Sequence, residues 1–385
     1  MFHFPFNFKQ ICYMHNGSVI TSIELYKLFI PLKEPFVISL GPIHSVQNVL
    51  VIIRTADGCA GYGECSPYMS INGESVDTCF IVGQYFAKAL KGQNALDLVA
   101  NIHIMDKIIW ANSSIKSAFD MALHDVAAQH AGLPLYQFLG GDKTKILYTD
   151  MTVSIGTPEK MAADALRFKE QGFTVIKVKL GEHPERDLER IKAIRDAVGM
   201  DIPIRVDANQ GWATTEVAIQ MVQALSAYNI QHCEEPIARW KFMELPLISD
   251  GSPIPIMADE SCCEPHDAER LIGLNACHML NIKLGKSGGI YKAVQIVEMA
   301  AQAELPMQIG GFMESRLGMT ASAHLALINP FIHHCDFDTP LMFTQDPVIG
   351  GITYGDKYVV EVPDAPGLGA VIDERFLEKA EKVVV

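Results

Sequence analysis

The chain has 385 residues, with 49% apolar and 20% charged residues, which is typical of a soluble protein of one large or two smaller domains. Its net charge of −14, without a run of lysines or arginines, argues against nucleic acid or an anionic membrane as the main partner. No apolar run reaches the roughly 18 residues that a membrane span needs, so we expect no membrane partner.

Residues 1–18 open the chain with several aromatic side chains. They lack a basic leader, a continuous apolar segment and a small-residue cleavage site, so we predict a loose extension rather than a signal peptide. The nine cysteines are odd in number and contain no C-x-x-C pair. This usage favours reduced thiols and a cytoplasmic location.

The segments 18–32 and 48–65 have the β-branched, alternating pattern of strands in an antiparallel meander. Residues 114–132 have the pattern of a helix. At the other end, residues 341–385 are too many for one last helix, and 358–369 resemble a further strand and turn. We therefore predict an α+β capping domain over residues 19–147, completed by 341–385.

From residue 148 the sequence repeats a short apolar run, a polar loop and an amphipathic segment. One residue marks the end of each apolar run: Thr152, Lys179, Asp207, Glu234, Asp259, Lys283, Gly310 and Asp336. Successive members of this set are 24 to 28 residues apart. Eight β/α units of that length predict a TIM-type barrel over residues 148–340.

The segments between these strand-end residues carry helix signals. Thr157 followed by Pro158 is typical of a helix start, and Gly172 is typical of a helix end. Between residues 184 and 199 apolar residues recur at helical spacing. These patterns predict helices over 158–171 and 184–198.

Asp207, Glu234 and Asp259 end three consecutive predicted strands. Catalytic groups of a TIM barrel lie at the carboxyl ends of its strands, so these carboxylates should converge, and oxygen ligands suit Mg²⁺ or Mn²⁺. Lys179 and Lys283 end strands two and six, on opposite sides of that point. Each residue alone is more often a helix cap or a surface side chain, and the indication comes from five charged strand ends in order.

Two other metal or phosphate patterns are weaker. The "GKS" of residues 285–287 resembles a phosphate-binding loop, but the required glycine is replaced by Leu280, so we reject it. His333, His334 and Cys335 could form a transition-metal site. Alternation along a strand puts only His334 on the side of the neighbouring aspartates, which leaves this a minor alternative.

Asp336 and Asp338 lie two residues apart in an apolar, strand-like segment. In an extended chain they would point to the same side, where each raises the cost of ionising the other. A folding argument alone does not explain such a pair. We therefore predict that they bind a cation.

Six segments together resemble the enolase superfamily, in its muconate-lactonizing subgroup. They are "KVK" (177–179), "DANQGW" (207–212), "EEP" (234–236), "ADES" (258–261), "NIKLGKSGG" (281–289) and "DFD" (336–338). The "DFD" segment resembles the dipeptide epimerases of that subgroup. The resemblance covers roughly residues 20 to 370 and implies an α/β fold, a modified (β/α)7β TIM barrel beneath an α+β cap. We also expect a homo-oligomer.

The resemblance implies one Mg²⁺ per subunit on Asp207, Glu234 and Asp259, with Lys179 and Lys283 as catalytic bases. It further implies a dipeptide substrate, whose free ammonium would be bound by Asp336 and Asp338. Thr152, Lys177, Gly311 and Met313 are the remaining substrate-binding residues that it implies. A divalent cation stabilises the enediolate formed when the α-proton leaves, and the two lysines can then act on opposite faces. Lysine bases with Mg²⁺ in enolase-type sites are an established pattern.

Substrate specificity should depend on two cap segments, 39–45 and 66–75. Epimerases that act on Ala-Glu have an arginine in the first, where this chain has Gly41. Ile43, Met69 and Ile71 instead favour a small or aliphatic second residue, as in L-Ala-L-Xaa dipeptides. The alternatives are a cycloisomerase or an o-succinylbenzoate synthase-type lyase of the same subgroup, or a metal-binding relative without turnover.

Overall fold

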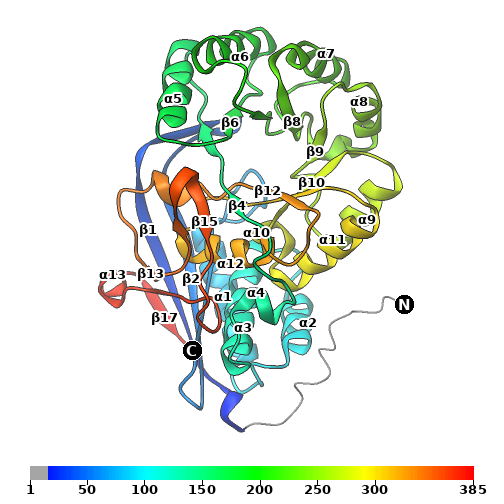
Figure 1. The fold of residues 1–385 in the computed structure, drawn as a ribbon. Coiled ribbons are helices and arrows are strands. Elements are labelled where there is room, and N and C mark those ends of the chain that lie inside the picture. Colours follow the sequence, from blue (N-terminus) through cyan, green and yellow to red (C-terminus); the bar gives the residue numbers. More distant parts are fainter. Residues whose placement is uncertain (1–15) are drawn as a thin grey trace.

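The cap is built on a four-stranded antiparallel sheet made from both ends of the described chain (Figure 1). The computed structural model describes residues 16–385, so most of the extension expected over 1–18 lies outside the described residues. The strand order is β17-β1-β2-β3. These strands are β1 (Ile20–Ile38), β2 (Gly41–Thr55), β3 (Ala60–Cys65) and β17 (Lys382–Val384). The predicted meander is confirmed.

The first hairpin is longer than the sequence pattern suggests. β1 and β2 stay paired from Ile20 and Thr55 to Ile38 and Gly41, with irregularities in the register on the way. The cap segment 39–45 is therefore the tip of this hairpin and part of β2. The segment contains glycine, proline and exposed residues, which are uncommon in strands. The sequence pattern therefore does not indicate that it pairs.

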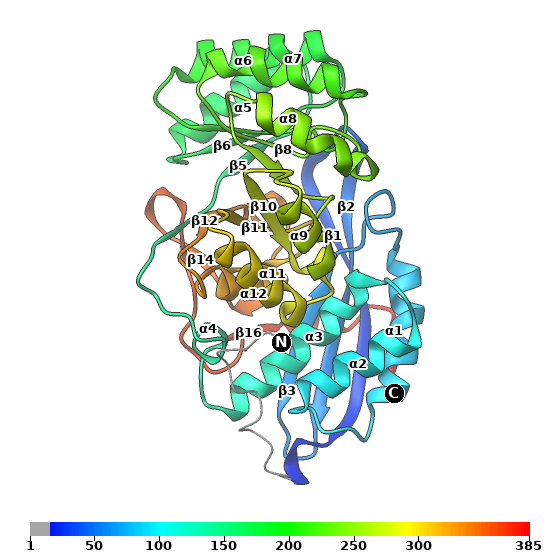
Figure 2. The same cartoon turned by 90° about the vertical axis from the view of Figure 1, so that its right-hand side faces the viewer.

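Three helices cover the cap sheet (Figure 2): α1 (Val76–Leu90), α2 (Leu98–Ile108) and α3 (Ser113–His130). β3 lies directly on α3, and a Cβ at Gly63 would come within 1.9 Å of the Ala118 carbonyl oxygen. Only glycine permits this approach. The contact fixes where β3 ends and where the following cap segment begins.

Eight parallel strands follow in chain order in one sheet. They are β5 (Met151–Val153), β6 (Ile176–Lys179), β7 (Ile204–Asp207), β8 (Ile230–Glu234), β9 (Ile256–Ala258), β10 (Met279–Lys283), β11 (Met307–Gly310) and β12 (Ile332–Cys335). A single parallel bridge between Thr149 and Cys335 joins the two ends of the sheet. The predicted barrel is confirmed, and each strand-end residue lies within a strand or directly after it.

Helices connect these strands: α5 (Pro158–Glu170), α6 (Pro184–Val198), α7 (Thr215–Leu225), α8 (Leu245–Gly251), α9 (Pro265–Gly273), α10 (Leu284–Ser287), α11 (Ile290–Gln302) and α12 (Arg316–Ala326). The helix signals act as predicted. The Thr157 hydroxyl accepts a hydrogen bond from the Lys160 backbone N–H at 3.3 Å. Gly172, just past α5, has a φ of +100°, which favours glycine.

After β12 and before β17 joins the cap, the chain forms two small sheets, one of which also includes β4 from before the barrel. Their strands are β13 (Val348–Gly350), β16 (Ala370–Ile372), β14 (Thr353–Tyr354), β15 (Val359–Glu361) and β4 (Leu147–Tyr148). The remaining short helices are α4 (Leu135–Phe138), α13 (Glu374–Leu377) and the 3-10 turns η2 (Asn16–Ser18), η3 (Ser226–Tyr228), η4 (Arg239–Glu244), η5 (Thr339–Met342) and η6 (Asp356–Tyr358). The exact domain boundaries stay predictions.

One continuous hydrophobic cluster runs through the cap and the barrel. A second, small cluster lies where the long hairpin reaches the barrel, and contains Ile30, Leu32, Val46, Met313 and Phe343. Cap and barrel are thus packed together at the side where the strand ends lie. Among residues 16–385 no helix has the length and apolarity to cross a membrane.

Candidate active site

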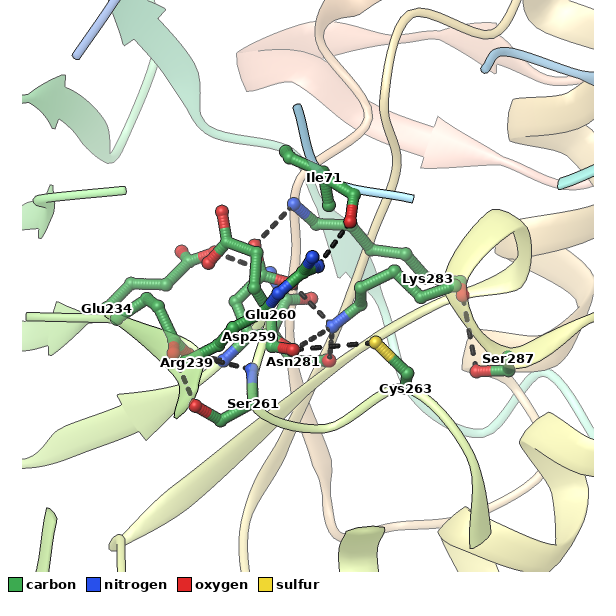
Figure 3. Close-up of polar contacts among 12 residues, drawn as sticks. Ile71, Glu234, Arg239, Asp259, Glu260, Ser261, Cys263, Asn281, Lys283 and Ser287 are labelled. Atoms are coloured by element: carbon green, nitrogen blue, oxygen red, sulfur yellow. Dashed lines mark hydrogen bonds and ion pairs between the residues drawn. The ribbon is translucent and has the colours of Figure 1, made fainter. Parts of the chain in front are cut away.

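Three carboxylates meet at the carboxyl ends of β7, β8 and β9. Asp207 and Glu234 are the last residues of their strands, and Asp259 directly follows β9. One oxygen from each lies within 4.8 Å of the others, and all three side chains are buried. Figure 3 shows two of them, Glu234 and Asp259. We call these residues the first carboxylate cluster. The sequence-based expectation that the three would converge is borne out by this geometry.

Polar neighbours fix each member of the first cluster. The Asn281 amide donates to Glu234 Oε1 at 2.7 Å, and the Asn209 backbone N–H donates to Asp207 Oδ1 at 2.8 Å. The buried Lys286 ammonium lies 2.5 Å from Asp259 Oδ1 and also donates to the Asn281 carbonyl at 2.9 Å. Our sequence reasoning did not identify Asn281 or Lys286.

The two predicted bases lie against this cluster from opposite sides. Lys179 Nζ is 2.6 Å from Asp207 Oδ2, and Lys283 Nζ is 2.6 Å from Asp259 Oδ2. Their strands, β6 and β10, are the second and sixth of eight. Burial lowers the pKa of Lys283, but the charges of Asp259 and Glu234 outweigh it and hold this pKa above its ordinary value.

The lysines in turn lower the pKa of two members of the first cluster, Asp207 and Glu234. Burial raises the pKa of Asp207, but the Lys179 and Lys177 ammonium groups outweigh it, so the pKa lies below its ordinary value. For Glu234 burial acts in the same direction, and Lys177 and Lys283 lower the pKa overall. Asp207 and Glu234 therefore offer negatively charged oxygen ligands.

The acidic residues next to this cluster have other partners. Glu235 accepts hydrogen bonds from the Asp259 and Ser261 backbone N–H groups at 2.6 and 3.3 Å, and burial raises its pKa to about 7. Burial and the charge of Asp259 also raise the pKa of Glu260, which accepts from the Asn209 amide at 3.3 Å. Both lie around the cluster rather than in it.

Asp336, Asp338 and Asp150 form a second carboxylate cluster, with one oxygen from each within 4.8 Å of the others. β12 ends at Cys335, and Asp338 has the helical dihedrals φ −84° and ψ −19°. The two aspartates of "DFD" therefore meet across a turn rather than along an extended strand. Asp338 Oδ2 accepts a hydrogen bond from the Thr152 backbone N–H at 2.7 Å.

The second cluster has less positive charge around it. Lys177 Nζ lies 2.8 Å from Asp336 Oδ2 and 2.8 Å from Glu234 Oε2, so it bridges the two clusters. Although burial alone would raise it, the pKa of Asp336 falls to about 2 because of Lys177. Burial and the charge of Asp336 raise the pKa of Asp338. The same two causes, burial first, raise the pKa of Asp150 to about 7.

Asp150 is paired with Arg205 Nη1 at 2.7 Å, and our sequence reasoning missed both residues. A signal was present, because residues i and i−2 of a strand face the same side. The residues two positions before seven of the strand-end residues are polar: Asp150, Lys177, Arg205, His232, Asn281, Gln308 and His334. They form a polar layer inside the barrel beneath the site.

A small cavity joins the lysines to the second cluster. Its barrel side is lined by Thr152, Lys179, Asn209, Lys283, Gly311, Phe312, Met313, Asp336, Asp338 and Thr339. Of the predicted substrate-binding residues, Lys177 alone lies beneath the cavity rather than in its wall. A larger cavity of about 540 Å³ shares Phe36 and Thr152 with it but contains neither predicted base. We place the chemistry in the smaller cavity because the charged groups meet there.

The cap closes the cavity with apolar side chains, which include Phe36, Ile43 and Ile71. Met69, expected to face the substrate, is instead 73% exposed. Gly41 has a φ of +120°, a conformation that side chains other than glycine rarely adopt. The hairpin tip could therefore not carry an arginine at this position without backbone strain.

The alternative transition-metal site is wrong. His334 Nδ1 is bound to Arg205 Nη2 at 2.8 Å, and His333 is exposed. Within residues 16–385 the two carboxylate clusters are the groups that could hold a metal ion, and neither includes these histidines or Cys335. The eight cysteines of the described chain are free.

Comparison with known proteins gives matches over nearly the whole chain. The family model "Enolase C-terminal domain-like" matches residues 160–376, and the model "Mandelate racemase / muconate lactonizing enzyme, N-terminal domain" matches residues 21–140. The D-Ala-D/L-Ala epimerase of Cytophaga hutchinsonii is 57% identical over 95% of this chain and 100% of its own.

Solved structures agree. The dipeptide epimerase of Cytophaga hutchinsonii, complexed with Mg and D-Ala-L-Val, has a TM-score of 0.94 over 95% of this chain and 100% of its own. The dipeptide epimerase of Enterococcus faecalis, complexed with Mg and L-Leu-L-Tyr, is 37% identical, with a TM-score of 0.88 over 91% and 99% of the two chains. The chain therefore belongs to the muconate-lactonizing subgroup of the enolase superfamily.

Proposed function

We propose that this protein is a Mg²⁺-dependent dipeptide epimerase, which inverts the α-carbon of the C-terminal residue. The observation that carries the proposal is one cavity lined by both lysines, with two carboxylates of the second cluster, Asp336 and Asp338, in its wall. The similarity to dipeptide epimerases over almost the full length of both chains supports it.

The first carboxylate cluster suits the metal. Asp207, Glu234 and Asp259 are buried and close enough to share one ion, and three carboxylate oxygens are the donors that Mg²⁺ prefers. When bound there, a divalent cation stabilises the negative charge that develops on the substrate carboxylate. Asn281 and Lys286 hold two of the ligands in position.

The second carboxylate cluster binds the dipeptide's ammonium group through Asp336 and Asp338. A buried cation needs charged partners, and an ammonium between these carboxylates relieves the repulsion that raises the pKa of Asp338. Thr152 orients Asp338 through its backbone N–H. Gly311 and Met313 border the substrate from the next strand end.

The two lysines carry out the proton transfers. With the dipeptide anchored at its ammonium and carboxylate ends, its second α-carbon lies between Lys179 and Lys283. One lysine removes the α-proton from one face, and the other donates a proton to the opposite face. The result is inversion at that carbon with no change in composition.

The second residue of the substrate is small or aliphatic, because Ile43 and Ile71 line the cavity and, among residues 16–385, no cationic side chain of the cap does. The first residue is an alanine, predicted above in the L form. The Cytophaga hutchinsonii relative is named for a D-alanine. A comparison of L-Ala-L-Leu with D-Ala-L-Leu decides which configuration this cavity accepts.

The alternatives account for fewer features. A cycloisomerase or lyase of the subgroup acts on substrates without an ammonium group, which leaves the second cluster without a role. A relative without turnover needs no base on each side of the cavity. The cytoplasmic location, argued above from cysteine usage, and the expected homo-oligomeric state are further parts of the proposal.

The deciding experiment incubates the Mg²⁺-loaded protein with a dipeptide library in D₂O and follows deuterium uptake by mass spectrometry. We expect one deuterium at the second α-carbon of dipeptides such as L-Ala-L-Leu, with formation of the epimer. Turnover of ammonium-free succinylbenzoate-type or muconate substrates, with no dipeptide exchanged, would refute the proposal.

A further inference from the structure

One side chain of the barrel reaches up to the cap segment that closes the cavity. Arg239 begins the turn η4 after β8, and its Nη1 group donates a hydrogen bond to the Ile71 carbonyl (Figure 3). Ile71 is 4% exposed, and its side chain lines the cavity beside the two predicted bases. A barrel residue that is not in the cavity wall thus holds a residue that is.

The contact lies in the middle of the cap segment 66–75, away from the anchors at its two ends. At the start, the Ser66 hydroxyl accepts from the Met313 backbone N–H at 3.2 Å. At the end, the Glu74 carboxylate accepts from the Ser114 backbone N–H at 2.8 Å. Between them, the backbone N–H groups of Ile71 and Asn72 donate to the Tyr68 carbonyl within the segment itself. The hydrogen bond from Arg239 therefore connects this middle part to the barrel.

Arg239 is itself bonded to the segments that directly follow Asp207 and Glu234 of the first carboxylate cluster. Its backbone N–H donates to Gln210 Oε1 at 3.1 Å, and the Gln210 backbone N–H donates to the Glu235 carbonyl at 2.8 Å. Gln210 belongs to the turn after Asp207 and has a left-handed φ of +69°. Within residues 16–385 the Arg239 guanidinium forms no ion pair, so the Ile71 carbonyl is its fixed acceptor.

We propose that Arg239 is a positioning residue, which holds the cap segment 66–75 closed so that Ile71 contacts the second side chain of the dipeptide. The inference rests on the proposed function for its substrate but on the contacts above for its geometry. A hydrogen bond from a charged donor is among the stronger ones in proteins. Its loss should weaken binding of larger aliphatic residues more than that of alanine.

The test compares Arg239→Met with Lys241→Met. Lys241 lies on the same turn η4 and donates to the Ala213 carbonyl at 3.1 Å, so its replacement also removes a cation that binds a carbonyl, but not one in the cap. We expect Arg239→Met to raise KM for L-Ala-L-Leu about 10-fold, with a smaller change for L-Ala-L-Ala. Lys241→Met should match the unaltered enzyme, and Arg239→Lys should lie between.

A second measurement does not depend on dipeptide turnover. Chymotrypsin cleaves after aromatic residues, and Tyr68 lies in the cap segment. In the Mg²⁺-loaded proteins we expect cleavage after Tyr68 to be about 10-fold faster in Arg239→Met than in Lys241→Met, with similar melting temperatures. Equal cleavage rates would overturn the proposal. So would an unchanged ratio of kcat/KM for L-Ala-L-Leu over L-Ala-L-Ala. If no dipeptide is turned over by the unaltered enzyme, the proposed function fails and the cleavage rates still decide the role of Arg239.

Discussion

The two carboxylate clusters of this barrel lie side by side and differ in how many cationic side chains pair with their carboxylates. The first, Asp207, Glu234 and Asp259, has the ammonium groups of four lysines within ion-pair distance. The second, Asp150, Asp336 and Asp338, has one lysine at Asp336 and an arginine at Asp150, and no cation within ion-pair distance of Asp338 among residues 16–385.

The pKa values of the carboxyl groups differ between the two clusters in the same way. The pKa values of Asp207 and Glu234 lie below their ordinary range despite burial, whereas burial and neighbouring carboxylates raise those of Asp338 and Asp150. A protein keeps buried acids ionised by pairing them. Each carboxylate of the first cluster therefore has a lysine beside it, while Asp338 in the second cluster lacks a positive group within the described chain. In the proposed reaction the dipeptide brings that group.

Of the changes near the two clusters, removal of a base should reduce the epimerisation rate most. Lys283→Ala leaves Asp259 with Lys286 as its cation and removes the proton donor or acceptor on one face. Net epimerisation should fall about 10³-fold or more in both directions. Chiral chromatography of L-Ala-L-Leu measures the loss. In D₂O, Lys179→Ala and Lys283→Ala should retain exchange of opposite epimers. Net epimerisation at a near-native rate in either variant would contradict the two-base assignment.

Removing the metal from the first cluster comes next. Excess chelator should abolish epimerisation, and added Mg²⁺ should restore it, because the developing charge then lacks its counter-ion. Asp259→Asn should weaken Mg²⁺ binding and turnover together, as isothermal titration and kinetics can show. Asp201→Asn, at an exposed surface position, is the matched control. Full activity in chelator would show that the first cluster does not work through a metal.

A neutral residue in the second cluster should have a smaller effect. Asp338→Asn leaves the substrate ammonium with one carboxylate fewer. It should lower kcat/KM for L-Ala-L-Leu by a factor that corresponds to about 2–4 kcal/mol of lost transition-state stabilisation. N-acetyl-L-Ala-L-Leu should be a poor substrate of the native enzyme. Asp338→Asn should change kcat/KM for this acetylated dipeptide only slightly. A double-mutant cycle over enzyme and substrate gives the coupling. Equal effects on both substrates would mean that Asp338 does not bind the ammonium.

The same substitution should stabilise the fold slightly. Burial raises the pKa of Asp338 above its unfolded value, so its ionisation costs stability as the pH rises above about 4. Asparagine keeps an acceptor for the Thr152 N–H and removes the charge. At pH 8 and without dipeptide we expect Asp338→Asn to raise Tm by about 2 °C, and the gain to vanish below about pH 4. A lower Tm than that of Asp201→Asn at pH 8 would disagree with this account.

The spacing of strand ends predicted the barrel and the three residues of the first cluster, because parallel strands bring their carboxyl ends to one face. It did not reveal how side chains from neighbouring strands pair below that face. Lys286 follows β10 on the short helix α10, and only the folded chain brings its ammonium to Asp259. The exposure of Met69 beside the buried Ile71 also depends on the course of the cap segment, which no periodic pattern describes.

The bridge between Thr149 and Cys335 has a consequence for the order of folding. It joins segments 186 residues apart, and Asp150, Asp336 and the Thr152 contact to Asp338 all lie next to it. Residues 207–259, which supply the first cluster, leave the ribosome well before β12 is made, and chains are synthesised at about 5–20 residues per second. Closure of the barrel and completion of the ammonium pocket are thus one late event. A nascent chain can gather its metal ligands several seconds before it can hold a dipeptide.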